Sequence, residues 1–369
     1  MRERENEFME RALALAANGL GLAAPNPMVG AVVVAGDRIV GEGWHEGPGT
    51  PHAEVMALRE AGERARGATL YTSLEPCSHQ GRTPPCAPAV AKAGIASVVA
   101  AVRDPNPIVD GQGIRILREA GVRVDEGVLA GPAGRLIEGF AKHVTTGLPF
   151  VTLKMAASLD GKVAARDGTS RWITGPQARE DVHRLRAGSG AIVVGAGTVL
   201  ADDPSLTVRL EGYRGRPPLR VAVDAAGRIG RVAALFDGAA PTLVATVPGV
   251  DASTRQEWER AGAEVLTLDR TDEERGVSLP LLIEMLGKRD IQNVLIEGGP
   301  TLAWSAVEEG VVDRLVLYVA PKLIGGVTAP GILGGRGILT LADALPMDIV
   351  QTETLGSDLK VVADVHRDR

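Results

Sequence analysis

The chain has 369 residues and a formal net charge of −6, and 45% of its residues are hydrophobic, 23% charged and only 3% aromatic. This length exceeds one ordinary hydrophobic core and predicts two domains, while the lack of a basic excess argues against a nucleic-acid-binding protein. The sequence contains no run of 18 apolar residues and no N-terminal cleavage signal, so we expect a cytoplasmic protein without a membrane partner.

The first half of the chain alternates helices and strands. A helix with an apolar face that includes Phe8, Ala12 and Leu15 is predicted to end at Gly19, and residues 31–44 predict a hairpin. Further helices are predicted over residues 51–62, 84–94 and 116–121, and strands over residues 68–77, 96–104 and 122–128. This alternation predicts a largely parallel sheet with helices on both faces.

The alternation restarts near residue 147. Strands are predicted over residues 150–158, 191–200, 219–229, 240–249 and 313–325, helices over residues 175–188 and 279–289, and a strand–turn–helix unit over residues 293–310. The two halves show no internal repeat and no low-complexity linker. We therefore expect two different domains, residues 1–146 and residues 147–369.

Three segments of the first half carry residues suited to a catalytic zinc ion. His52 and Glu54 lie at the start of one predicted helix, Cys77 follows a predicted strand, and Cys86 begins the next predicted helix. A catalytic zinc binds three protein ligands and keeps one position open for water, and one imidazole with two thiolates meets that requirement. Zinc lowers the pKa of its water to roughly 7, and Glu54, which is not a ligand, can then move protons to the substrate ring and the departing ammonia.

Other interpretations of these residues stay open at this point. An isolated His-x-Glu is usually a surface feature of a helix, and two cysteines are often inert core residues. A structural zinc site would recruit a fourth ligand, for which His45 or His79 is available. The conjunction of all three segments favours a zinc-dependent hydrolytic deaminase.

The spacing of the two cysteines departs from the Pro-Cys-x-x-Cys signature of nucleobase deaminases. Here Cys86 lies nine positions after Cys77, within the segment TSLEPCSHQGRTPPC at residues 72–86. This segment, with PNPMVGAVVV at residues 25–34 and DPNPIVDGQGI at residues 104–114, resembles the bifunctional diaminohydroxyphosphoribosylaminopyrimidine deaminases/5-amino-6-(5-phosphoribosylamino)uracil reductases of bacterial riboflavin biosynthesis. The resemblance covers essentially the whole chain.

The resemblance implies an α/β protein in which a cytidine-deaminase-like three-layer domain precedes a dihydrofolate-reductase-like domain. It implies one Zn2+ per chain in the first domain and NADPH in the second. The implied reactions are the hydrolytic deamination of a pyrimidine ribotide, a diaminopyrimidinone with a ribosyl 5′-phosphate, and the reduction of its ribosyl side chain to ribityl. By analogy the protein would be a homo-oligomer, either a dimer or a tetramer.

The long loop between the cysteines favours a phosphorylated substrate. His79 and Arg82 on this loop are candidates to meet the phosphate or the pyrimidine ring, and a loop that is merely stiffened by its prolines is the alternative. Asn26, which lies between two prolines, is a candidate to bond the ribose or the ring, with a plain turn role as the alternative.

In the second half the resemblance rests on the motifs KMAASLDG (154–161), SRWIT (170–174), TVLADDPSLTVR (198–209) and EGGP (297–300). By position in these motifs, the residues implied to contact NADPH are Ala156, Trp172, Thr198, Asp202, Gly299, Pro300 and Thr301. The residues implied to contact the substrate are Ser170, Arg186, Leu206, Arg209 and Glu297. Ala225 stands where some relatives have a serine, so no side chain is named for the 2′-phosphate of NADPH.

The reduction needs cations for the phosphate and a proton donor for opening the ribose ring. Arg186 and Arg209 suit bidentate phosphate contacts. Lys154 and Glu297 are the candidate partners in proton transfer, and a structural ion pair between them is the alternative.

Two other functions stay open from the sequence. A cytidine- or tRNA-adenosine-type deaminase fused to an unrelated reductase conflicts with the cysteine spacing and with the lack of basic charge. A zinc-stabilised binding protein without turnover would be unaffected by the replacement of Glu54, whereas a deaminase would lose ammonia release and keep its zinc.

Overall fold

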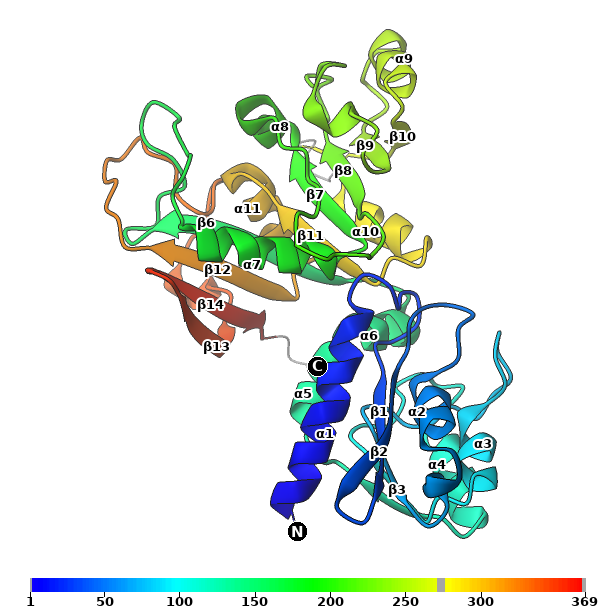
Figure 1. The fold of residues 1–369 in the computed structure, drawn as a ribbon. Helices are drawn as coiled ribbons and strands as arrows, with labels where there is room; N and C mark the ends of the chain where they lie inside the picture. The colour runs from blue at the N-terminus through cyan, green and yellow to red at the C-terminus, as the bar shows by residue number, and fades with distance from the viewer. Residues whose placement is uncertain (1, 271–275, 367–369) are drawn as a thin grey trace. The chain divides into compact units, whose positions relative to one another are not determined.

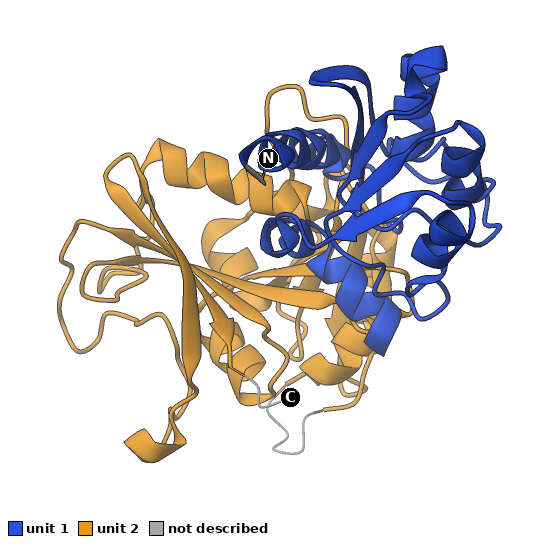
Figure 2. Cartoon of the chain, turned by 90° about the horizontal axis from the view of Figure 1, so that it is seen from below, with its two compact units in different colours: residues 1–147 blue, residues 148–369 orange. Residues whose placement is uncertain are grey.

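The computed structural model describes residues 2–270 and 276–366. The chain forms two compact units, Met1–Gly147 and Leu148–Arg369, and each has its own sheet and hydrophobic core (Figure 2). The division falls one residue after the boundary expected from the sequence. None of the helices in the described ranges combines the length and apolar composition needed to cross a bilayer.

The N-terminal unit is built around a five-stranded sheet with the strand order β2-β1-β3-β4-β5 (Figure 1). Its strands are β1 (Gly30–Ala35), β2 (Arg38–Trp44), β3 (Thr69–Thr72), β4 (Ser97–Ala100) and β5 (Arg123–Glu126). Its helices are α1 (Arg2–Ala16), α2 (Ala53–Ala61), α3 (Cys86–Lys92), α4 (Gln112–Glu119), α5 (Ala130–Leu136) and α6 (Glu138–Thr146), with 3-10 turns at Ala17–Gly19 and Gly62–Ala65.

This sheet is mixed, so the expectation of a largely parallel sheet was correct only for its β3-β4-β5 part. β1 is antiparallel to both β2 and β3, whereas β3, β4 and β5 are parallel. The short turn at Gly36-Asp37 joins β1 to β2, and a turn of this length permits only antiparallel pairing.

Alternate side chains of β1 contribute to two different cores. Val33 packs into the core shared with α2, α3 and α4, whereas Val34 packs into the core shared with α1. Gly30 allows α1 to approach the sheet closely, because a Cβ atom there would lie 2.0 Å from the carbonyl oxygen of Ala12. The unit therefore has three layers, with helices on both faces of the sheet.

The last two helices of this unit were not predicted. The α5 segment AGPAGRL contains two glycines and a proline, a composition that disfavours a helix in isolation. Tertiary packing overrides this preference, because α5 buries Ala133 in the core of α1 and α6 buries Phe140 in the opposite core.

The C-terminal unit is built around a nine-stranded sheet with the order β10-β9-β8-β7-β11-β6-β12-β14-β13 (Figure 1). Its strands are β6 (Phe150–Ser158), β7 (Ala191–Gly195), β8 (Leu219–Val223), β9 (Thr242–Thr246), β10 (Glu264–Thr267), β11 (Asn293–Glu297), β12 (Arg314–Ala320), β13 (Met347–Leu355) and β14 (Asp358–Val365). Its helices are α7 (Pro176–Ala187), α8 (Ala196–Asp202), α9 (Ala252–Arg260), α10 (Leu279–Gly287) and α11 (Pro300–Glu308), with 3-10 turns at Ala234–Phe236 and Leu341–Asp343.

The strands from β10 to β12 in this order all run parallel, and only β14 and β13 are added antiparallel. The carboxyl ends of the parallel strands therefore meet at one edge of the sheet, where open α/β sheets bind their ligands.

The structure differs from the sequence expectation in several elements of this unit. The strand predicted over residues 191–200 ends at Gly195 and continues as α8. The helix α9 and the strands β10, β13 and β14 were not predicted. Within α9 only Trp258 is buried, and most residues of β13 are exposed, so neither segment carries the apolar periodicity on which the predictions depended.

Candidate functional sites

The three predicted zinc ligands come together from three separate segments. His52 immediately precedes α2, Cys77 lies in the loop after β3, and Cys86 is the first residue of α3. Their ligand atoms all lie within 4.8 Å of one another, and Nδ1 of His52 is 3.5 Å from the Cys77 sulfur and 3.3 Å from the Cys86 sulfur. Within the described ranges no fourth His, Cys, Asp or Glu joins this cluster, and neither His45 nor His79 belongs to it.

The donor set fits zinc. One imidazole nitrogen and two sulfurs are the ligands of a three-coordinate protein site that leaves a position open for catalysis. Oγ1 of Thr83 lies 3.1 Å from Nε2 of His52, and this contact holds the ring with Nδ1 toward the sulfurs. The backbone N–H of Cys86 donates to the Cys77 sulfur at 3.3 Å and fixes that ligand as well.

Glu54 lies in the first turn of α2 beside the ligands, and only 3% of its surface is exposed. Burial, with the charge of Cys77 as the next cause, raises the pKa of the Glu54 carboxyl to about 7. A hydrogen bond with Cys86 lowers the pKa of the Cys77 thiol to about 4, and the same bond raises the pKa of Cys86. A carboxyl that titrates near neutral pH can both accept and donate a proton, as general acid–base catalysis requires.

A pocket of about 270 Å³ contains Glu54 and two of the ligands in its lining. Asn26 and His45 also line it and form a hydrogen-bonded pair, with 2.9 Å between Nδ2 and Nε2. His79 and Arg82 line the same pocket from the long loop, and both are exposed. His79 and Arg82, the candidate residues of the long loop, thus lie at the same pocket as the metal ligands His52 and Cys77.

Glu75 anchors the segment that precedes Cys77. Its buried carboxylate accepts four backbone N–H groups, from Asp104 (3.2 Å), Gly111 (3.0 Å), Gly113 (2.9 Å) and Ile114 (3.2 Å). A Cβ atom at Gly113 would lie 1.9 Å from the carbonyl oxygen of the residue before Cys77, so the two segments are in direct contact. Glu75 therefore ties the segment 104–114 to the loop that presents the zinc ligand Cys77.

Replacement of Glu75 by Ala is expected to lower the free energy of unfolding of the N-terminal unit by about 3 kcal/mol, because four donors lose a charged acceptor. Glu75→Gln keeps one carbonyl oxygen and should lose roughly half as much. Urea unfolding of the zinc-loaded protein measures both values. Equal stability of the two variants and the unchanged protein would contradict this anchoring role.

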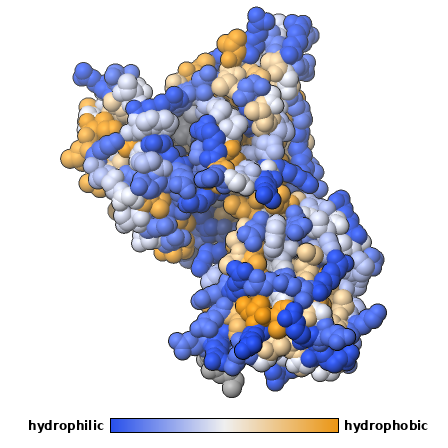
Figure 3. All heavy atoms as spheres, viewed as in Figure 1, coloured by the Kyte–Doolittle hydropathy of each residue, from blue (hydrophilic) through white to orange (hydrophobic). Residues whose placement is uncertain are grey.

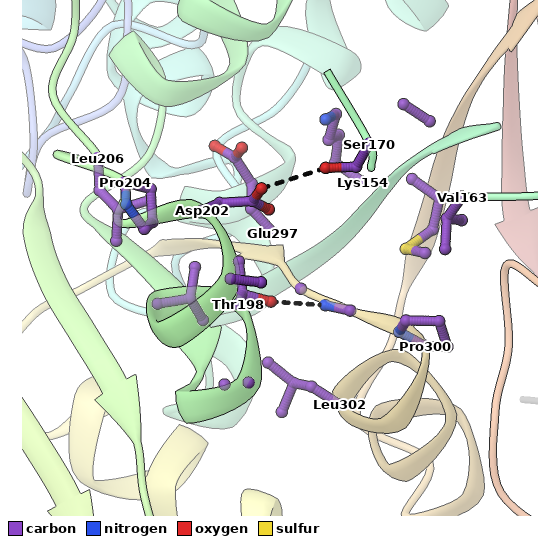
Figure 4. Close-up of a pocket in the computed structure, with 18 of the residues that line it drawn as sticks. Lys154, Val163, Ser170, Thr198, Asp202, Pro204, Leu206, Glu297, Pro300 and Leu302 are labelled. Atoms are coloured by element: carbon purple, nitrogen blue, oxygen red, sulfur yellow. Dashed lines mark hydrogen bonds between the residues drawn. The ribbon is translucent and has the colours of Figure 1, made fainter. Parts of the chain in front are cut away.

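A larger cavity, of about 1150 Å³, lies in the C-terminal unit at the carboxyl ends of β6, β7, β8 and β11. Every candidate site residue of this half lines it: Lys154, Ala156, Ser170, Trp172, Arg186, Thr198, Asp202, Leu206, Arg209, Glu297, Gly299, Pro300 and Thr301. Figure 4 shows how Lys154, Ser170 and Glu297 lie in this cavity. Lys154 and Glu297, which are 143 positions apart in the chain, thus converge because the parallel strands all end at the same edge.

Glu297 pairs with Arg186 rather than with Lys154. Nε and Nη2 of Arg186 donate to the two carboxylate oxygens at 2.6 and 3.0 Å, and Nη1 donates to the carbonyl oxygen of Thr207 at 3.1 Å. Burial by itself would raise the pKa of Glu297, but the charge and hydrogen bonds of Arg186 hold it below the usual range. All three nitrogens of Arg186, which was expected to contact the substrate phosphate, are therefore engaged within the protein.

The side-chain nitrogen of Lys154 forms no hydrogen bond and no ion pair with any residue that the structure describes, so the ion pair with Glu297, the alternative interpretation, is not formed. Its Nζ lies 6.0 Å from the centre of the Tyr318 ring. Burial lowers the pKa of Lys154, and the positive charge of Arg186 contributes in the same direction against the opposing charge of Glu297. An ammonium with a lowered pKa is a stronger acid than an exposed lysine.

Two hydrogen bonds hold the walls of this cavity (Figure 4). The N–H of Gly299 donates to Oγ1 of Thr198 at 2.9 Å, and the hydroxyl of Ser170 donates to Asp202 at 3.1 Å. Leu206, which is buried, has a φ of 51°, a left-handed conformation that a leucine rarely adopts. Such backbone outliers concentrate at ligand sites.

The sequence alone indicated no role for Thr83, Glu75 and His183, although each of them forms hydrogen bonds with a candidate site residue or with a segment next to one. Thr83 orients His52, and Nδ1 of His183 accepts the backbone N–H of Arg209 at 3.2 Å. Thr83 and Glu75 both lie inside the segment TSLEPCSHQGRTPPC, so their proximity to the cysteines was the available signal. His183 has no local signal, because its partner lies 26 positions away.

Two family models match this chain. Residues 149–361 match the RibD C-terminal domain, and residues 2–102 match the zinc-binding region of cytidine and deoxycytidylate deaminases. The second match contains the three clustered ligands and Glu54, and the first contains the whole lining of the larger cavity.

Curated relatives and solved structures resemble the chain over nearly its whole length. It is 44% identical to the riboflavin biosynthesis protein RibD of Bacillus amyloliquefaciens, over 99% of this chain and 100% of that protein, and 43% identical to RibD of Escherichia coli, over 95% and 97%. RibD from Acinetobacter baumannii matches with a TM-score of 0.87 and 39% identity over 100% of both chains. A diaminohydroxyphosphoribosylaminopyrimidine deaminase/5-amino-6-(5-phosphoribosylamino)uracil reductase from Thermotoga maritima matches with a TM-score of 0.86 and 36% identity over 99% of both chains.

Proposed function

Because the chain belongs to the RibD family of bifunctional deaminase/reductases, we propose that it performs two successive steps of riboflavin biosynthesis. The N-terminal unit hydrolyses an amino group of a diaminopyrimidinone ribotide and releases ammonia. The C-terminal unit then reduces the ribosyl side chain to ribityl. The observation that carries this proposal is the three-ligand cluster beside the buried carboxyl of Glu54, combined with a separate cavity that contains Lys154.

In the deaminase site, His52, Cys77 and Cys86 would hold zinc, which supplies the Lewis acidity that makes a water molecule nucleophilic near neutral pH. Glu54 takes a proton from that water and delivers it to the pyrimidine ring. A second proton transfer through Glu54 lets the amino group leave as ammonia, and a carbonyl group remains on the ring.

The long loop is proposed to recognise the ribosyl phosphate. Arg82 and His79 are exposed in the pocket lining and can approach an anion, and Asn26 is placed to bond the ribose or the ring. Arg82→Ala should raise the KM of deamination roughly tenfold or more, because one charge-assisted hydrogen bond is lost, while Arg59→Ala on the outside of α2 should not. An unchanged KM for Arg82→Ala would exclude Arg82 as a phosphate ligand.

In the reductase cavity, NADPH supplies the hydride that is added at C1 of the ribosyl group. The sugar ring must open first, and this opening needs a proton on the ring oxygen. Lys154 is proposed to donate this proton, and Glu297, held by Arg186, is proposed to bond the sugar hydroxyls. Arg209, whose guanidinium donates one hydrogen bond to the Ser205 hydroxyl, is the proposed phosphate ligand.

The remaining candidate residues, those proposed for NADPH and for the substrate, line the same cavity, which is large enough for a dinucleotide and a ribotide together.

We also propose a cytoplasmic homo-oligomer. Figure 3 shows apolar residues gathered at the left of the view, where Figure 1 places the loop after β12, and Leu323, Val327, Leu339 and Leu341 of this loop are all more than three-quarters exposed. Light scattering coupled to size-exclusion chromatography measures the oligomeric state, and a strictly monomeric protein would contradict this part.

The test of the function offers the purified protein the diaminopyrimidinone ribotide with and without NADPH. Ammonia should appear in both reactions, and NADPH should be oxidised only after deamination. If neither ammonia release nor NADPH oxidation occurred, the proposed function would be wrong.

A further inference from the structure

The turn that follows β8 is held rigidly at the edge of the larger cavity. Asp224, with 1% of its surface exposed, accepts the backbone N–H groups of Ala226 (3.1 Å), Arg228 (2.6 Å) and Ile229 (2.8 Å). The hydroxyl of Thr246 on β9 donates to the carbonyl oxygen of Asp224 at 2.7 Å. The backbone of Arg228 is therefore fixed before any ligand binds.

The side chain of Arg228 is exposed, lines the cavity, and forms no hydrogen bond or ion pair with any described residue. Two other arginines of the cavity are engaged more extensively within the protein. Arg186 pairs with Glu297, and Arg171 donates to the carbonyl oxygen of Asp202. Arg228 thus keeps its planar set of donors available for an anion.

Arg228 is separated along the sheet from the groups proposed for the chemistry. In the order β8-β7-β11-β6, three strand intervals separate it from the strand that carries Lys154, about 14 Å at ordinary strand spacing. Val223 and Ala225 next to Arg228 give the wall an apolar surface suited to an aromatic ring. The cavity therefore has a cationic position several strands away from Lys154, where a part of the cofactor remote from the reacting carbon can be bound.

We propose that Arg228 binds the 2′-phosphate on the adenosine ribose of NADPH and so selects NADPH over NADH, an inference that rests on the proposed reductase function. Dinucleotide sites commonly use an acid for the free ribose 2′-hydroxyl and an arginine for the 2′-phosphate. The acid nearest to Arg228 in sequence, Asp224, is buried and its oxygens are occupied by backbone donors. Ala225 offers no side-chain donor, which leaves the arginine as the polar group of this turn that faces the cavity.

Isothermal titration calorimetry of the full chain with NADP+ and with NAD+ tests this role without depending on turnover. Arg228→Ala should weaken NADP+ binding at least about tenfold and change NAD+ binding less than about twofold, since a charge-assisted phosphate contact is lost. The affinity of Arg228→Lys for NADP+ should lie between those of the unchanged protein and Arg228→Ala, because lysine keeps the charge but not the planar donor set. Arg231→Ala, which removes an exposed arginine of the same connection that does not line the cavity, is the matched control and should change neither.

A parallel titration with adenosine 2′-monophosphate and ribose 5-phosphate separates the two phosphates that the cavity must hold. Loss of adenosine 2′-monophosphate binding alone in Arg228→Ala supports the proposal. Loss of ribose 5-phosphate binding alone assigns Arg228 to the substrate and overturns it, as does an equal effect on NADP+ and NAD+ or no effect on either. If the unchanged protein bound no dinucleotide at all, the reductase function itself would be refuted. If the unchanged protein and Arg228→Ala both bound NADP+ normally, only the role of Arg228 would be refuted.

Discussion

Replacement of Glu54 by Gln is expected to lower the rate of ammonia release by roughly 10²–10⁴-fold, because an amide cannot carry protons from the attacking water to the ring and the leaving group. The change preserves the size of a side chain that is almost completely buried, so the fold should persist. Zinc content should also persist, because the cluster of His52, Cys77 and Cys86 does not include Glu54. Ammonia release, metal analysis of the purified variant and NADPH oxidation on the already deaminated ribotide measure the three effects separately.

The matched control for this prediction is Glu63→Gln, the same chemical change at an exposed position after α2. It should leave ammonia release unchanged. If Glu54→Gln lost its zinc together with its activity, the role of Glu54 would be structural. If it kept normal ammonia release, another group would have to move the protons.

The metal site could be predicted from the sequence because its information is local. His52 and Glu54 share one helix start, and Cys86 follows Cys77 after nine positions, so the residue types and their proximity in the chain indicated the chemistry. The predicted zinc cofactor, fold class and bifunctional activity are confirmed by the family matches. The roles of the individual residues in the reductase cavity stay predictions, although all of them line the same space.

The pairing of Arg186 with Glu297 could not be predicted, because it joins residues 111 positions apart through the order of the strands. The pattern of polar and apolar residues shows which face of a strand is buried, but it does not show which strands are neighbours. For the same reason the anchoring role of Glu75 depends on a segment 29 to 39 positions later in the chain. The strand β13 was missed for a different reason: it is exposed along most of its length and so lacks the alternation of a half-buried strand.

Replacement of Lys154 by Met is expected to lower the rate of NADPH oxidation by roughly 10²–10⁴-fold, because the variant retains the length of the side chain but has no proton to donate to the ribose ring. Deamination should be unchanged, since Glu54 and the metal ligands belong to the other unit. Binding of NADP+ by calorimetry should change little, which separates proton transfer from cofactor binding. The matched control is Lys288→Met, at an exposed lysine near the end of α10.

The pH dependence of the reduction distinguishes a proton donor from a group that only shapes the cavity. Lys154 can act as an acid only while it is protonated, and burial lowers its pKa, so the rate of the unchanged protein should fall as the pH rises through a value below that of an exposed lysine. In Lys154→Met the residual rate should lose this alkaline decline, because no group with that pKa remains in the step. If the residual rate still declined over the same pH range, another group would be the proton donor. That group would not be Glu297, because Arg186 holds the pKa of Glu297 below its usual range. The alkaline limb therefore identifies the donor independently of how much activity the variant loses.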